Sequence, residues 1–252
     1  IRLPYDYYHR GCATTALEFV KEALGETVIV YNRSLYKNSP TARELCIKHS
    51  QRALWVQFFA LLIVGNEADE PLVGEQQLII PTDLVHAWQQ ATVNGKPLLA
   101  SEPNILVEGE PKVADGWFTP MVLAILLLIL SIANLLWKRP YFDWLMLAAQ
   151  TLVGCFMTYL ICFSDLCCTD WNWLIIPFNP LPLIFWYWRK YWALPYAGVL
   201  TIWCLAMAAM TLWGHVLVDW SHILMVVAWI IIVIKQYIVN KFINIEKSEC
   251  QC

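Results

Sequence analysis

Long apolar runs dominate the second half of the chain, from residue 117 onward. Four of the five runs are long enough to cross the hydrocarbon core of a bilayer, which takes about 20 residues of helix. The third run is shorter and interrupted by prolines, so it predicts either a kinked span or a partly re-entrant one. The five runs are Trp117–Trp137, Trp144–Phe163, Trp171–Trp188, Pro195–Val216 and Trp220–Val239.

The first half alternates shorter apolar stretches with polar turns, which is typical of a domain that folds outside the membrane. Leu17, Val20 and Leu24 recur at helical spacing, and Gly25 is placed to end that helix in a left-handed cap. The run Ala53–Val64 is too short to span a bilayer and predicts a buried core helix. Further helices are expected after Ser39-Pro40-Thr41 and Pro81-Thr82-Asp83, with strands at Pro97–Leu99 and Ile105–Val107 around an Asn94-Gly95 turn.

Composition agrees with this division into two halves. Apolar residues make up 59% of the chain and charged residues only 15%, which is too apolar for an ordinary soluble domain. The formal net charge is −3 and the basic residues do not cluster, so nucleic-acid binding is excluded. We therefore expect a soluble domain over residues 1–115, a five-helix transmembrane domain over 116–243 and a tail over 244–252. Because the chain starts at Ile1 and no signal peptide precedes the soluble part, we expect it to be trimmed at its start.

The basic residues of the second half predict the orientation. They fall in alternate inter-span segments, whereas the loops 164–170 and 217–219 hold none. The positive-inside rule then places the C-terminus in the cytoplasm and the N-terminal domain in the periplasm of a bacterial inner membrane. The seven basic residues are Lys138, Arg139, Arg189, Lys190, Lys235, Lys241 and Lys247.

Cys12 is the candidate nucleophile because it stands where the first helix is predicted to start. The unpaired backbone N–H groups and the positive end of the helix dipole favour a thiolate there. An aromatic run, a turn and then a cysteine opening a helix is also how papain-like and NlpC-type enzymes present their nucleophile. The alternative is a small, half-buried thiol in a helix cap. No metal-ligand set accompanies the cysteines, and no cofactor is expected.

Several segments, taken in order, resemble the bacterial Lnb-type family. Cys12-Ala13-Thr14 after a Tyr-rich run is similar to the family motif Asn-Cys-x-Thr, and a five-span region follows as in that family. Four more segments resemble family segments in the same order: Arg43, Trp55, Gly65 and Asp69; Ile79 to Leu84; Gly95-Lys96-Pro97-Leu98; and Asn172 through Leu181.

The resemblance implies a thiol-dependent lipoprotein N-acyltransferase with an α+β papain-like (NlpC-related) periplasmic domain, N-terminally truncated, followed by an all-α five-span membrane bundle. A membrane phospholipid donates an acyl chain to a thioester on the cysteine, and the α-amine of a diacylglyceryl-cysteine lipoprotein accepts it. Cys12 is then the catalytic residue. The candidates for catalytic or supporting roles are His9, Tyr8, Thr14, Arg43 and Asp69.

Two departures from the family pattern concern the nucleophile. Gly11 stands where the motif has asparagine, and the family's general-base histidine lies further upstream, at a position that is expected to precede Ile1. His9 lies only three residues before Cys12 and is the nearest substitute. In the membrane half, Asn172 and Asn179 flank the proline-broken third run, and we expect them to line a cavity. Asn134 and Gln150 are expected to hold helices together.

Two other functions fit the same pattern. A membrane-anchored cysteine peptidase or amidase of the cell envelope uses the same cysteine geometry, although one membrane anchor is enough for it. A non-catalytic membrane scaffold is favoured by Gly11 and by the missing upstream histidine. Lipid-acyl labelling of Cys12 separates the three, because only the acyltransferase becomes a lipid thioester.

Overall fold

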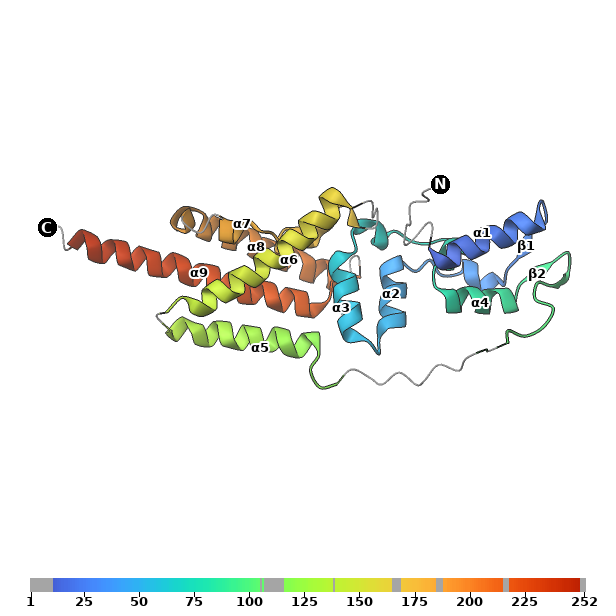
Figure 1. Cartoon of the computed structure of the whole chain (residues 1–252), viewed down its shortest axis with the longest axis horizontal. Helices are drawn as coiled ribbons and strands as arrows, with labels where there is room; N and C mark the ends of the chain where they lie inside the picture. The colour runs from blue at the N-terminus through green and yellow to red at the C-terminus, as the bar shows by residue number, and fades with distance from the viewer. Residues whose placement is uncertain are drawn as a thin grey trace. The chain divides into compact units, whose positions relative to one another are not determined.

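The computed structural model describes most of the chain and divides it into two compact units (Figure 1). The first unit is made from the described parts of residues 1–52, 64–114 and 165–171, and the second from those of 53–63, 115–164 and 172–252. The structure describes residues 11–104, 106, 116–137, 139–164, 169–184, 188–214 and 218–249.

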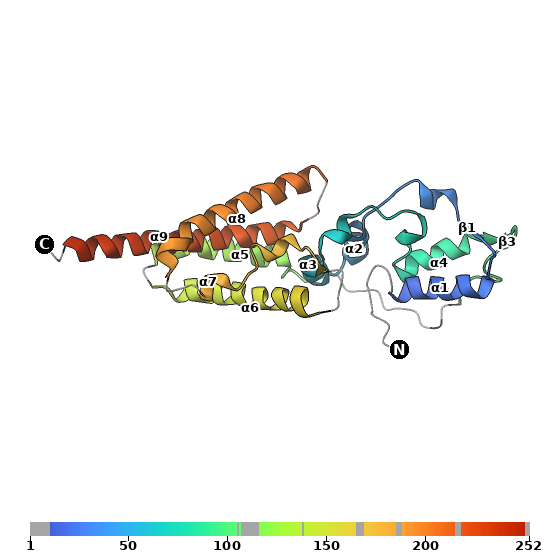
Figure 2. The same cartoon turned by 90° about the horizontal axis from the view of Figure 1, so that it is seen from above.

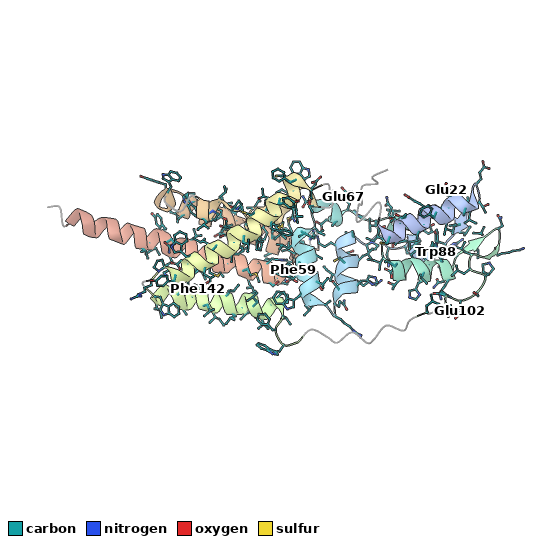
Figure 3. The ribbon with its side chains drawn as sticks, viewed as in Figure 1. Glu22, Phe59, Glu67, Trp88, Glu102 and Phe142 are labelled. Atoms are coloured by element: carbon teal, nitrogen blue, oxygen red, sulfur yellow. The ribbon has the colours of Figure 1, made fainter. Side chains whose placement is uncertain are left out.

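In the first unit, two helices pack side by side through their apolar faces (Figures 1 and 2). They are α1 (Cys12–Leu24) and α4 (Pro81–Gln89). Ala13 and Leu17 of α1 are buried with Leu84 of α4 in one apolar cluster. Trp88 on α4, labelled in Figure 3, packs at the edge of this cluster. As the sequence predicts, α1 ends at Gly25 with a positive φ of 62°, but the ψ of −126° lies outside the left-handed helical region that was expected.

A small antiparallel sheet lies next to these helices. Its three strands are β1 (Ile29–Val30), β2 (Thr92–Val93) and β3 (Lys96–Pro97), in that order. Ile29 pairs with Val93, and Thr92 pairs with Pro97 across the Asn94-Gly95 turn. The second hairpin strand therefore starts at Lys96, one residue before the predicted strand, and residues 105 and 107 of the other predicted strand lie outside the described residues. Two-residue strands do not establish a papain-like sheet, so that finer fold remains a proposal.

The described part of the first unit also contains α2 (Ala42–Ser50) and short helical turns. Thr41 caps α2 with a reciprocal capping box, because its hydroxyl accepts from the Glu44 N–H while the Glu44 carboxylate accepts from the Thr41 N–H. The 3₁₀ turns are η1 (Arg33–Tyr36), η2 (Asn66–Asp69) and η3 (Gly74–Gln77).

The second unit is a helical bundle of membrane type. Among the described residues, three helices are long and apolar enough to cross a membrane: Tyr141–Phe163, Tyr191–Leu212 and Trp220–Val239. The elements of the bundle are α3 (Leu54–Ile63), α5 (Pro120–Ala133), η4 (Asn134–Leu136), α6 (Tyr141–Phe163), η6 (Trp173–Ile175), α7 (Leu181–Ile184), α8 (Arg189–Leu212) and α9 (Trp220–Glu249). The third apolar run is thus broken into short helical pieces, as its prolines predict.

Helix α9 is central to the bundle and packs along both α5 and α8 (Figure 2). Val226 and Ile232 of α9 are buried with Leu200 of α8, and Phe178 of the third run packs edge-to-face on Trp229. Helix α9 continues to Glu249, through residues that the sequence analysis assigns to the tail.

The short helix α3 differs from its sequence prediction. We expected it in the core of the soluble domain, but it belongs to the bundle unit. Its Phe58 is buried with Ala124 of α5 and Met225 of α9, and stacks on His222 with ring centroids 4.3 Å apart. Its Phe59, labelled in Figure 3, is 55% exposed. An apolar helix of ten residues has a face to bury whichever unit it joins, so its hydrophobic pattern could not name the partner.

Candidate functional site

Helix α1 begins at Cys12, and the Cys12 side chain is exposed. The preceding Gly11 has an extended backbone and no side chain with which to cap the helix. The first backbone N–H groups of α1, which have no partner within the helix, therefore lie beside the thiol. The positive end of the helix dipole lies at the same place. The same turn is anchored by the next residue, because Ala13 is buried in the cluster with α4. A rigid turn thus presents the thiol away from the apolar core.

Only one supporting candidate close to Cys12 falls within the described residues. The Thr14 hydroxyl donates a hydrogen bond of 3.1 Å to the Gly11 carbonyl, and the Thr15 N–H donates to the same oxygen at 3.0 Å. Thr14 therefore closes the first turn of α1 around Cys12, so its observed contact stabilises the backbone that carries the thiol. His9 and Tyr8 lie outside the described residues.

Arg43 and Asp69 are brought together, although 26 residues separate them in the chain. The Arg43 Nε donates to Asp69 Oδ1 at 2.7 Å, and Nη2 donates to Asp69 Oδ2 at 3.1 Å. The same Nη2 donates to the Gly65 carbonyl at 3.0 Å. Arg43 is 5% exposed, so this fork is a buried, bidentate ion pair. It fixes the turn that follows α3.

Gly65 needs that fixed position because it has a close backbone neighbour. A Cβ atom at residue 65 would overlap the carbonyl oxygen of Asp170. Three of the four residues in the Arg, Trp, Gly, Asp pattern thus form one structural unit. The fourth, Trp55, lies in the bundle and donates from its indole to the Phe118 carbonyl at 2.9 Å.

Replacing Arg43 by methionine is expected to destabilise this turn by about 3–5 kcal/mol, because Asp69 is left largely buried without its counter-charge. Amide hydrogen exchange of residues 66–69 in the whole protein measures the local loss directly. Arg43→Lys is the control that keeps the charge and loses the fork, and we expect an intermediate effect. Unchanged exchange in Arg43→Met would contradict the assigned role.

The two described histidines of the first unit have side-chain neighbours within hydrogen-bond distance, and burial raises the pKa of a cysteine and a tyrosine. His49 Nε2 lies 2.8 Å from Asp83 Oδ2, and His86 Nδ1 lies 3.2 Å from Gln89 Oε1. Burial raises the pKa of the Cys46 thiol, which keeps it protonated and less reactive. Burial, with the nearby Glu75 carboxylate, raises the pKa of Tyr31 to about 12.

A hollow of about 420 Å³ lies between α2, α4 and η1. Tyr31, Lys48, Gln77, Asp83 and His86 contribute polar groups to its wall, and Cys12 does not line it. Among the described residues, no group of three or more His, Cys, Asp or Glu side chains is placed to hold a metal ion.

Asn172 links the third run to α3 inside the bundle. Its Nδ2 donates to the Leu62 carbonyl at 2.8 Å, and its Oδ1 accepts from the Leu174 N–H at 2.9 Å. Both ends of the amide are therefore satisfied within the unit, and the side chain is 4% exposed. These contacts hold helices together, and the cavity expected at Asn172 remains a prediction.

Asn179 belongs to a polar cluster with Gln150 and Tyr196. Both amide nitrogens donate to the Tyr196 hydroxyl at 2.9 Å. Gln150 also donates to the Pro177 carbonyl, and one turn further along α6 a Cβ at Gly154 would overlap the Asn179 backbone. Close backbone approach and amide hydrogen bonds therefore hold the broken third run against α6. Gln150 acts as the helix-linking side chain predicted from the sequence, with Asn179 as a partner of the same cluster.

A buried charged cluster in the bundle was not predicted from the sequence. Asp143 of α6 is fully buried and accepts a hydrogen bond from Lys235 of α9 at 3.2 Å. Asn134 and Gln236 also donate to its carboxylate. Lys235 is therefore a buried partner within a helix, and counting it among the loop cations was wrong. An acidic and a basic side chain in two otherwise apolar spans are expected to pair. This rule could have predicted the contact between Asp143 and Lys235 from the sequence.

The decisive comparison concerns this bundle. Residues 112–248, more than half of the chain, match the Lnb transmembrane domain.

The chain belongs to the Lnb family.

The matched region starts before α5 and reaches into the end of α9, so the Asp143 and Tyr196 clusters lie within an Lnb domain. Cys12, Arg43 and Asp69 precede the match. No curated protein matches the chain, and no solved structure does. Membership in the Lnb family therefore rests on the membrane domain, and the role of Cys12 belongs to the proposal below.

Proposed function

We propose that this Lnb-family protein is a membrane-bound lipoprotein N-acyltransferase that uses Cys12 as its nucleophile. The acyl donor is a membrane phospholipid, and the acceptor is the α-amine of a diacylglyceryl-cysteine lipoprotein. The observation that carries the proposal is the match of residues 112–248 to the Lnb transmembrane domain. The exposed thiol at the start of α1 supports it, because such a thiol is available to a substrate.

In the first half-reaction, the Cys12 thiolate attacks the carbonyl carbon of a phospholipid ester. A C–S bond forms, the ester C–O bond breaks, and the departing lysophospholipid oxygen takes up a proton. The proton released by the thiol passes to a base, for which we propose His9. The backbone N–H groups that follow Cys12 stabilise the negative charge on the carbonyl oxygen.

In the second half-reaction, the lipoprotein amine attacks the thioester. A C–N bond forms, the C–S bond breaks, and the thiolate is restored when the amine loses its proton. An α-amine has a pKa near 8, so about a tenth of it is neutral and nucleophilic at pH 7. Scarcity of water at the bilayer surface favours the amine over hydrolysis.

The rest of the chain supports this chemistry in the proposal. Residues 1–115, apart from helix α3, form the periplasmic domain of papain-like character, in which Thr14 fixes the first turn of α1 and the Arg43–Asp69 pair fixes the turn at Gly65. The bundle anchors this domain in the inner membrane with its C-terminus in the cytoplasm. Lys235 is buried within α9 and does not count toward this orientation. The basic residues between the spans, such as Lys138 and Arg139, still support it.

The test is to place the full-length protein in phospholipid vesicles with a synthetic diacylglyceryl lipopeptide. We expect the peptide to gain the mass of one acyl chain while an equal amount of lysophospholipid appears. Cleavage of a peptide or amide bond without acyl gain would instead indicate the peptidase or amidase. Absence of any reaction, with the protein folded and inserted, would indicate the scaffold, and either outcome contradicts the proposal.

A further inference from the structure

An apolar groove of about 420 Å³ lies within the bundle unit, between the broken third run and α8. Its lining is almost wholly apolar and includes Trp173 and Ile176 of the third run and Val199, Ile202 and Met210 of α8. Ile202 is 70% exposed, so the groove opens to the surroundings of the bundle. For helices of this apolarity those surroundings are lipid.

The groove has a fixed shape. Trp203 of α8 is 4% exposed, and its indole N–H donates to the Trp173 carbonyl at 3.0 Å. This bond joins the two walls at the bottom of the groove, because Trp203 lines it as well. Ala206 leaves the space between its larger neighbours unfilled. The hollow is therefore built from packed side chains and a hydrogen bond between its walls.

The stretch of α8 that lines the groove is about as long as one leaflet of a bilayer is deep. From Val199 to Met210 the helix rises about 17 Å, close to half of the roughly 30 Å hydrocarbon core. This stretch lies in the half of α8 that is remote from Arg189 and Lys190 at its start. In the proposed orientation that half faces the periplasm, which is the side on which Cys12 works.

We propose that the groove holds one acyl chain of a glycerophospholipid in the periplasmic leaflet, and that this lipid is the acyl donor. The assignment of a donor rests on the proposed function. A polar peptide finds almost no hydrogen-bonding partner in this lining. An extended hydrocarbon chain matches the apolar walls and the leaflet-long stretch of α8 that lines them.

The groove selects by chain shape and length. Lipid tails around the bundle are as apolar as the groove, so occupancy comes from van der Waals contact with the indole rings and not from the hydrophobic effect. We therefore expect lipid acyl chains to be modestly enriched at the groove relative to the rest of the bundle surface. The headgroup makes no contribution along this lining.

The experiment uses the full-length protein with Cys12→Ala, so that acyl transfer cannot consume the probe. Vesicles of phosphatidylethanolamine and phosphatidylglycerol carry a trace of phosphatidylethanolamine with a diazirine in its palmitoyl chain. After illumination, labelled residues are mapped by mass spectrometry. We expect labelling of groove residues to exceed that of Leu205, which is 68% exposed outside the groove, by about threefold or more.

Ala206→Trp fills the groove and is expected to remove this excess, whereas Leu205→Trp adds the same ring outside the groove and preserves it. Equal labelling of groove and non-groove residues would overturn the proposal, as would an excess that survives Ala206→Trp. Loss of the excess when a diacylglyceryl lipopeptide is added would assign the groove to the acceptor and overturn the donor assignment. Because the readout needs no acyl transfer, failure of the proposed function leaves it interpretable.

Discussion

Replacing Cys12 by alanine is expected to abolish lipoprotein N-acylation, with a loss of about 10⁴-fold or more, as for removal of a catalytic nucleophile elsewhere. The loss comes from chemistry and not from unfolding, because the Cys12 side chain is exposed and the turn that carries it is anchored by Ala13. The lipopeptide assay in phospholipid vesicles measures the rate.

Cys46→Ala is the matched control for this result. Cys46 is a thiol of the same unit, half-buried, and its pKa is raised by burial. We expect its removal to leave the rate nearly unchanged. Substantial activity in Cys12→Ala, or an equal loss in Cys46→Ala, would contradict the assignment of Cys12 as the nucleophile.

A large loss of stability is also expected from removal of the Asp143 carboxylate in the bundle. Asp143→Ala leaves the Lys235 ammonium buried without its counter-charge, and breaking such a pair costs about 3–5 kcal/mol. Lys235 is only 5% exposed, so solvent offers it little compensation in place. Unfolding of the purified protein in mixed micelles by a denaturing detergent measures the loss.

A double-mutant cycle isolates the pair from its surroundings. Lys235→Met is expected to be costly alone, whereas Asp143→Ala combined with Lys235→Met costs less than the sum of the two single changes. The difference is the coupling between the two charges. Additive losses would show that α6 and α9 are held together by packing alone, contrary to the hydrogen bonds at Asp143.

Local sequence rules predicted the elements that depend on neighbouring residues. The helix that opens at Cys12 and ends at Gly25 follows from spacing and capping, and Thr41 supplies its own capping signal. Three of the four long apolar runs form helices of spanning length, as composition and length predict, whereas the first run forms the shorter helix α5 and turn η4. The broken third run follows from its prolines. In each case the cause lies within a few residues of the effect.

Contacts between distant segments were harder to predict. Arg43 and Asp69 appeared in the family pattern, but only the structure shows that they form an ion pair. Lys235 was interpreted as a loop cation because its partner lies 92 residues earlier, in another helix. Helix α3 was assigned to the soluble domain because its pattern specifies a buried face and not the partner that buries it.

The central claim is that Cys12 carries a lipid-derived acyl group, and the direct measurement is the mass of the Cys12 peptide. The full-length protein is incubated in phospholipid vesicles without lipopeptide, quenched in acid and digested. We predict that the Cys12 peptide gains the mass of one acyl chain, that neutral hydroxylamine removes it, and that added lipopeptide discharges it. An unmodified Cys12 peptide from protein that still acylates lipopeptide would contradict the thioester mechanism.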